Sequence, residues 1–283
     1  MQENFEHCTA LVREADHDRY IATLFAPAEH RDALCALYAF NVEVTRVREL
    51  AREALPGEIR LQWWREALEG ARAEEASAHP VAAALREVLA RYTIRPDRLI
   101  GLIDAHTFDL YEEPMATLDD LDAYARASQG ALLQTAADIL AAGGAPSETL
   151  IGHAGIAYTL AGILSMLGRH AVRRQLFVPL EVLERHKLVP ANVFAREVGA
   201  PLHDALAELR RHARRQLAAA REELRSAPPE ILPALLPAAT VAATLDAMER
   251  PDYQPFAFEP PSRLRRQWQL WRAARNPRRI FEG

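Results

Sequence analysis

Hydrophobic and polar residues recur along this chain with the period of an α-helix in one segment after another. Between residues 28 and 50, apolar side chains return at steps of four and three residues, which places them on one buried helix face. These residues are Ala33, Leu37, Phe40, Val44 and Val47. The opposite face is also largely uncharged, and it carries Tyr38, Val42, Thr45 and Glu49. The pattern therefore predicts a helix that is covered on both sides, in the middle of the domain.

A second central helix is predicted from residue 151 to residue 168, where the chain carries no charged side chain. A helix that is apolar all round lies in a large core or spans a membrane. This run barely reaches the length of a membrane span and arginine follows at once, so a packed helix is favoured. Small residues along it let neighbouring backbones approach, and they are Gly152, Gly155, Ala157, Ala161 and Gly162. Residues that share one face are Thr159, Gly162, Ile163, Met166 and His170.

Proline, capping residues and glycine mark the ends of further helices. Helix-forming runs follow several prolines, because a missing N–H costs nothing in the first turn of a helix. These prolines are Pro27, Pro80, Pro96, Pro146 and Pro201. Thr117 and Asp120 have the spacing of a capping box before a long run to Leu140, and Gly143-Gly144 ends that run. We therefore expect about a dozen helices, arranged as an all-α bundle around a central cavity.

Length and composition indicate one folded domain over residues 1–283. With 283 residues, of which 49% are hydrophobic, the chain can bury a sizeable core, and no linker or repeat divides it. The formal charge of −5 gives no general case for nucleic-acid binding. Cys8 and Cys35 fit a reducing compartment better than a disulfide framework or a zinc site. The N-terminus lacks the order of residues typical of a secretory signal, so a cytoplasmic protein is expected.

The segment from residue 262 to residue 283 differs in charge from the rest, since it holds seven arginines and one glutamate. Leu264, Trp268 and Trp271 share one face of a predicted helix. Arginines displaced from that face are Arg265, Arg266, Arg272 and Arg275. Tryptophan beside arginine is typical of contact with a membrane surface, here its inner face, or with an acidic partner. The alternative interpretation is a terminal helix that docks on the core through its aromatic side chains.

Two stretches resemble the signatures of the squalene/phytoene synthase family. Residues 37–40 read Leu-Tyr-Ala-Phe, which is similar to the start of L-Y-A-F-C-R-x-x-D-D-x-x-D. Residues 155–179 fall in register with G-x-A-x-Q-L-T-N-I-L-R-D-x-x-x-D and a following loop that ends in Y-L-P. The residues in register are Gly155, Ala157, Leu160, Ile163, Leu164 and Pro179. Shorter matches follow in order over most of the chain. The resemblance implies an isoprenoid-synthase-type helical bundle.

The resemblance also implies a chemistry whose key residues are missing. Active members ionise an allylic diphosphate with Mg²⁺ held by aspartates, and join two prenyl units head to head. Thr45, Arg46 and Glu49 stand at the three aspartate positions of the first motif, and Val42 replaces its arginine. In the second motif, the residues at the Gln, Asn, Arg and two Asp positions are Thr159, Gly162, Ser165, Met166 and His170. We therefore expect no catalytic residue, no metal site and no cofactor, with Mg²⁺ only for an active synthase.

Several of these side chains have structural interpretations. Glu49 is predicted to form an ion pair with Arg46 and Arg48, and Tyr38 and Asn41 belong to the same pocket wall. His170 is expected to cap its helix or to bond a backbone carbonyl, and Met166 to fill the core.

Neighbouring segments are interpreted in the same way. The candidate substitutes for the lost carboxylates are interpreted as a solvated helix end, and they are Asp104, Asp109, Glu112 and Glu113. Trp63 and Trp64 cannot share a helix face, so one is expected inside and the other near the surface.

A closer likeness concerns one branch of the family. Residues 39–43 and 62–65, with Ser128-Gln129, resemble the branch that contains the mitochondrial assembly factor of respiratory complex I, which also lacks the aspartates. This resemblance implies a non-catalytic protein that assists assembly of the respiratory NADH dehydrogenase by contacting a subunit or an assembly intermediate. Two alternatives stay open. One is an active head-to-head prenyl transferase with substitute carboxylates, and the other is a module that holds a prenyl lipid without reacting it.

Overall fold

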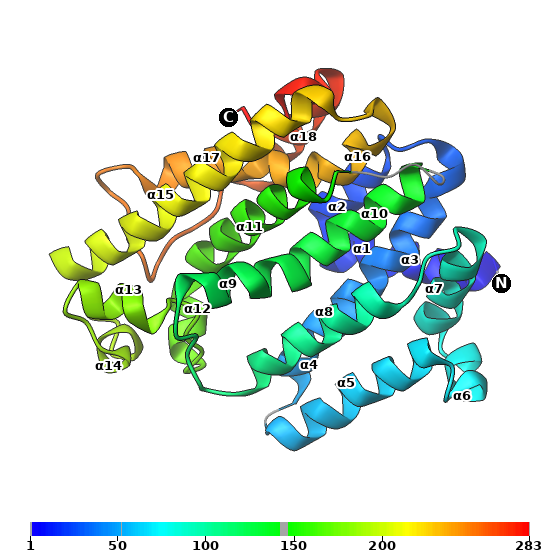
Figure 1. Ribbon diagram of the computed structural model, residues 1–283, viewed down its shortest axis with the longest axis horizontal. Coiled ribbons are helices and arrows are strands. Elements are labelled where there is room, and N and C mark those ends of the chain that lie inside the picture. The colour runs from blue at the N-terminus through cyan, green and yellow to red at the C-terminus, as the bar shows by residue number, and fades with distance from the viewer. Residues whose placement is uncertain (1, 52, 142–146, 283) are drawn as a thin grey trace.

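The computed structural model describes residues 2–51, 53–141 and 147–282, which form helices joined by short turns (Figure 1). No strand occurs among these residues, which confirms the all-α fold class. The predicted helix signals at Pro146 and Gly143-Gly144 lie outside the described residues.

The first half of the chain supplies one wall of the bundle and its lower layer in Figure 1. Its α-helices are α1 (Gln2–Ala15), α2 (His17–Thr23), α3 (Ala28–Thr45), α4 (Val47–Leu50), α5 (Ala54–Glu69), α6 (Ala73–Ala78), α7 (Pro80–Arg91) and α8 (Asp97–Thr107). A 3₁₀ turn, η1 (Phe108–Leu110), follows α8. The middle of the chain forms α9 (Leu118–Ala125), a π-helical turn η2 (Arg126–Gly130) and α10 (Ala131–Ala141).

The second half contains the central helix and the helices that cover it. Its α-helices are α11 (Glu148–Ser165), α12 (Leu167–Val172), α13 (Leu180–Arg185), α14 (Pro190–Phe194), α15 (Ala200–Glu223), α16 (Leu232–Leu235), α17 (Val241–Met248) and α18 (Arg263–Arg275). Short 3₁₀ turns are η3 (Leu224–Ser226), η4 (Pro229–Ile231), η5 (Leu236–Thr240) and η6 (Pro277–Arg279).

The predicted helix starts agree with the structure wherever they can be compared. Pro27 and Pro96 directly precede α3 and α8, while Pro80 and Pro201 occupy the first turns of α7 and α15. The capping box before α9 is also confirmed. Its first residue, Thr117, accepts a hydrogen bond from the backbone N–H of Asp120, and the Asp120 carboxylate accepts one from the backbone N–H of Thr117.

Three predicted helices are interrupted in the structure. The run from residue 28 breaks at Arg46, the run from residue 118 contains the π-helical turn η2, and the central helix breaks at Met166. At two of these breaks, a side-chain hydroxyl donates a hydrogen bond to a backbone carbonyl four residues earlier. Thr45 donates to the carbonyl of Asn41 (2.8 Å), and Ser165 donates to the carbonyl of Ala161 (2.7 Å). Such side chains offer the backbone an alternative partner and bend helices.

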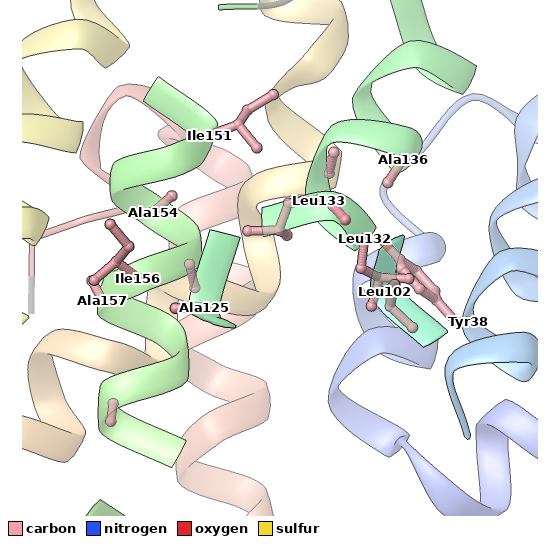
Figure 2. Close-up of a cluster of buried hydrophobic side chains, with 14 of the residues drawn as sticks. Tyr38, Leu102, Ala125, Leu132, Leu133, Ala136, Ile151, Ala154, Ile156 and Ala157 are labelled. Carbon is pink, nitrogen blue, oxygen red and sulfur yellow. The ribbon is translucent and has the colours of Figure 1, made fainter. Parts of the chain in front are cut away.

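The core is built around α11, which packs along α15, η2, α10 and α17. Figure 2 shows α11 side chains beside those of α10, with Tyr38 and Leu102 on the far side of α10. The labelled residues of α10 and α11 are buried, and they are Leu132, Leu133, Ala136, Ile151, Ala154, Ile156 and Ala157. Gly155 lies against the backbone of Gly130, where an added Cβ would stand 2.6 Å from the Gly130 Cα. The predicted close backbone approach is confirmed at this crossing.

Two further features concern burial. As the sequence predicts, one tryptophan of the pair is inside and the other near the surface: Trp64 is buried and Trp63 is partly exposed. Trp63 also donates its indole N–H to Glu75 Oε2 (2.9 Å). Within the described residues, the stretch Pro229–Met248 is long and apolar enough to cross a membrane by length and composition. Because 83% of its most apolar window is buried inside the fold, we assign it to the core.

Gly155→Ala should lower the free energy of unfolding by about 1–3 kcal/mol, because the added methyl group overpacks a contact between two backbones. Gly101→Ala is the matched control, since nothing lies within 4 Å of its added Cβ. That substitution should be neutral or stabilise helix α8 by up to ~1 kcal/mol. Urea unfolding measures both, and equal effects of the two substitutions would contradict the proposed packing.

Candidate ligand cavity

A cavity of about 510 Å³ lies between the end of α3 and the end of α11. Its walls also include residues of the α1–α2 turn, α4, α8, η1, η2 and α12. Nine of the ten pocket positions predicted from the sequence line it, and they are Asn41, Val42, Thr45, Arg46, Glu49, Thr159, Gly162, Met166 and His170. The tenth, Tyr38, is buried behind the wall rather than in it. The two degenerate motifs therefore face one shared space.

The helix breaks determine how these side chains enter the cavity. Since α3 ends at Thr45 and α11 at Ser165, the last residues of each motif lie in the short helices α4 and α12. The two motifs approach each other where Arg173 Nη2, just after α12, lies 3.1 Å from Glu49 Oε1 in α4. The predicted structural ion pair of Glu49 is thus confirmed, but its partner is Arg173 instead of Arg46 or Arg48, because the break at Arg46 redirects the chain before Glu49.

Met166 does not fill the core, contrary to the prediction. Its side chain is 36% exposed and lines the cavity at the turn between α11 and α12. If α11 continued, Met166 would extend its buried face and would be covered. The helix instead ends at Ser165, one residue earlier, and Met166 lies in the turn.

His170 is buried at 9% exposure and packs its ring against Phe177, with 4.7 Å between ring centroids. The expected bond to a backbone carbonyl is not formed, since its Nδ1 has no partner among the described residues. Burial lowers the pKa of His170 to about 4, and Arg173 and Arg169 act in the same direction against Asp109. The ring is therefore neutral at pH 7.

A buried network beside the cavity was not identified from the sequence. Asp109 Oδ2 lies 2.7 Å from His106 Nδ1, and the hydroxyl of Tyr124 donates to Asp109 Oδ1 over 3.0 Å. Burial, followed by the charge and hydrogen bond of Asp109, raises the pKa of Tyr124. The prediction that Asp109 belongs to a solvated helix end is wrong, because η1 turns it inward; the i, i+3 spacing of His106 and Asp109 was the available signal.

The other three carboxylates of that segment do lie at the surface, as predicted. They are Asp104, Glu112 and Glu113, which are all exposed. Arg65 pairs with Asp104, and Arg174 Nε lies 3.1 Å from Glu112 Oε2.

Arg19 supports the cavity from behind, and sequence patterns did not single it out. Its guanidinium stacks between the rings of Tyr38 and Tyr158, at 5.6 and 5.3 Å from their centroids. It also donates to Asp16 in the α1–α2 turn and to Gln129 in η2. This buried cation therefore ties α2, α3, α11 and η2 together below the motif residues.

The residues around the cavity do not fit a Mg²⁺ cluster. Three carboxylates of the described chain line it, and each is already engaged: Asp16 by Arg19, Glu49 by Arg173, and Asp109 by His106 and Tyr124. Among the described residues, no group of three or more histidine, cysteine, aspartate or glutamate side chains is placed to hold a metal ion. Magnesium needs several free oxygen ligands, and methionine and arginine supply none.

A separate surface is formed by α18 at the C-terminal end. Its Leu264, Trp268 and Trp271 side chains are 79%, 54% and 47% exposed, while Leu270 and Ala273 are buried against the core. The interpretation that the helix docks through its tryptophans is therefore wrong.

Four arginines of α18, those that the sequence places off the tryptophan face, fall into three groups. Arg272 and Arg275 stack over Trp268 and Trp271, with the guanidinium carbons 4.9 and 4.8 Å from the ring centroids. Arg266 instead pairs with Asp18 (2.7 Å), which holds α18 against α2, whereas Arg265 is exposed. Of the five predicted contact residues, four thus lie at the surface and Arg266 belongs to the docking face.

Comparisons with known proteins agree with this geometry. A family model described as squalene/phytoene synthase matches residues 12–272. Complex I assembly factor 6 of Mus musculus is 28% identical over 250 residues, which cover 88% of this chain and 75% of that protein. Its Drosophila melanogaster homolog is 23% identical over 261 residues, with 88% and 76% covered.

Solved structures show the same fold. A squalene synthase from Alicyclobacillus acidocaldarius superposes with a TM-score of 0.79 at 23% identity, covering 90% of this chain and 96% of that one. A dehydrosqualene synthase in complex with a ligand gives 0.80 at 16% identity, covering 98% and 96%. The predicted isoprenoid-synthase-type fold is confirmed, and at these identities the structures show the fold alone.

Stability should depend on pH through His170. Between pH 6.5 and about 4, the unfolded chain binds a proton at this side chain that the folded chain does not, so acid destabilises the fold. Relative to wild type, His170→Asn should gain roughly 3 kcal/mol of unfolding free energy between pH 7 and about pH 4. Urea unfolding at several pH values measures this, with the exposed His7→Asn as control. A difference between His170→Asn and wild type that stays constant with pH would contradict the neutral buried ring.

Proposed function

Since the chain belongs to the squalene/phytoene synthase family but its cavity does not fit the family's magnesium chemistry, we propose that it is a non-catalytic member. We further propose that it assists assembly of the respiratory NADH dehydrogenase, by contacting a subunit or an assembly intermediate of that complex. The observation that carries the first part is the replacement of four of the five motif aspartates by Thr45, Arg46, Met166 and His170, all of which line the cavity.

Breaking the C–O bond of an allylic diphosphate needs divalent cations that neutralise the departing charge. Losing one preorganised contact to such charge typically raises the barrier by about 2.7–4 kcal/mol. The remaining motif carboxylate, Glu49, is engaged by Arg173, and the substitute carboxylate Asp109 is engaged by two protein donors. An active prenyl transferase is therefore the weaker proposal, although the fold is shared with synthases.

The assembly role is supported by the relatives. Proteins named as complex I assembly factor 6, from mouse and fly, match 88% of this chain. The family model, which matches residues 12–272, extends over both cavity walls. We propose the same kind of client for this chain, without assigning which subunit it receives.

The surface of α18 suits work beside a membrane. Exposed Trp268 and Trp271 offer aromatic area, and the arginines stacked on them carry positive charge. Arginine near an anionic bilayer contributes about 1 kcal/mol per side chain, and tryptophan prefers the interface. We propose that α18 brings the protein to the inner face of the membrane, where a client subunit of a membrane complex is inserted.

Deleting the gene should lower the amount of assembled NADH dehydrogenase and leave squalene, hopanoid and carotenoid levels unchanged. Native gels with an in-gel activity stain measure the complex, and mass spectrometry measures the lipids. A copy with Glu49→Gln should restore assembly, because no carboxylate chemistry is needed and the Glu49–Arg173 pair is exposed. A copy with Trp268→Ser and Trp271→Ser should restore it less, with protein lost from the membrane fraction.

Two outcomes would contradict the proposal. Loss of isoprenoid products with normal NADH dehydrogenase would indicate a synthase. Full rescue by the double tryptophan variant, with unchanged membrane association, would remove the role of α18 but not the assembly role.

A further inference from the structure

Arginine side chains line the cavity in this chain, whereas the motifs of the squalene/phytoene synthase family carry carboxylates there. Arg46, Arg48, Arg169 and Arg173 all line it, and they come from both walls. Arg46 stands at a motif aspartate position, so the charge there is inverted rather than merely removed. Among the described residues, neither Arg46 nor Arg169 has a carboxylate within 4.0 Å of its guanidinium. With each lining carboxylate already engaged, the excess charge of the cavity is positive.

Unpartnered polar atoms gather around the same space. In the part of the chain that the structure describes, eleven buried side-chain atoms have no hydrogen-bond partner, and five of them belong to cavity residues. They are Asn41 Oδ1, Arg48 Nε, His106 Nε2, Thr159 Oγ1 and His170 Nδ1. A buried polar group left without a partner typically costs about 1–3 kcal/mol, so such atoms are rare unless something else satisfies them. Their concentration here indicates a cavity shaped for a polar ligand.

The kinds of group present define that ligand. Guanidinium groups donate bidentate hydrogen bonds to phosphate oxygens and need no metal ion to do so. The Thr159 hydroxyl and the neutral His170 ring are compact groups that can each donate one hydrogen bond to an anion, whereas Asn41 Oδ1 only accepts. A cation would meet Arg46 and Arg169 with no free carboxylate to offset them. The combination fits a ligand with several negatively charged oxygens.

We propose that this cavity binds a phosphate- or diphosphate-bearing ligand directly through Arg46 and Arg169, without a metal ion. The inference rests on the proposed non-catalytic function, because it assigns to arginine the neutralisation that Mg²⁺ provides in active members. It also predicts an inverted response to magnesium. Free Mg²⁺ pairs with the phosphate oxygens in solution and competes with the protein, so it weakens binding.

Isothermal titration calorimetry in EDTA tests the inference with two probes. Inorganic diphosphate carries the anionic group alone, and farnesyl thiodiphosphate adds a prenyl chain to an unreactive headgroup. We expect both to bind in EDTA and to bind less tightly when Mg²⁺ is added. Similar affinities indicate a free phosphate compound as the natural ligand, whereas much tighter binding of the second probe indicates a lipid headgroup.

Variants locate the site. Arg46→Gln and Arg169→Gln should each weaken binding by about tenfold or more, the typical effect of losing a hydrogen bond to a charged group. Arg60→Gln is the matched control, because Arg60 is exposed on α5 outside the cavity and the same charge is lost. Thermal unfolding of each variant verifies that it is folded.

The results separate this inference from the proposed function. Absence of binding in EDTA for both probes, or equal weakening by Arg60→Gln, overturns the inference and leaves the assembly role standing. Binding that requires Mg²⁺ overturns the inference and also counts against a non-catalytic cavity. Binding in EDTA that Arg46→Gln and Arg169→Gln remove supports both.

Discussion

The contact between Gly155 of α11 and Gly130 of η2 is the constraint on which the cavity depends. Two backbones meet there with no space for a side chain, and the π-helical turn lets the chain from α9 to α10 follow α11 closely. Arg19 then joins α2 to the same turn through Gln129. These contacts hold the helices that carry the two motifs, whatever side chains those motifs contain.

This separation of scaffold from chemistry explains how a synthase fold can lose its metal ligands. The apolar contacts of α11 and the glycine crossing make no use of the motif aspartates, so their replacement leaves the walls in place. What changes is the charge of the space between the walls. Arg46 stands at an aspartate position and the buried His170 ring is neutral, so under the proposed non-catalytic function the cavity carries positive charge where the family motifs carry aspartates.

Much of the fold was predictable because helix periodicity and end signals are local. The buried face of α3, the capping box at Thr117 and the packed α11 all follow from residues close in sequence. The errors concern side chains whose surroundings depend on helix breaks. Met166 and Glu49 lie just beyond hydroxyl-bearing helix ends, and η1 turns Asp109 inward. Partners distant in sequence, such as Arg173 for Glu49, cannot be inferred from spacing along one helix.

The measurement that tests the central claim most directly is product formation from farnesyl or geranylgeranyl diphosphate with Mg²⁺. If the cavity has lost its metal chemistry, no squalene- or phytoene-type product should exceed that of a buffer control, however much protein is added. Product clearly above that control and abolished by EDTA would show that ligands other than the motif aspartates hold the metal, and would contradict the account.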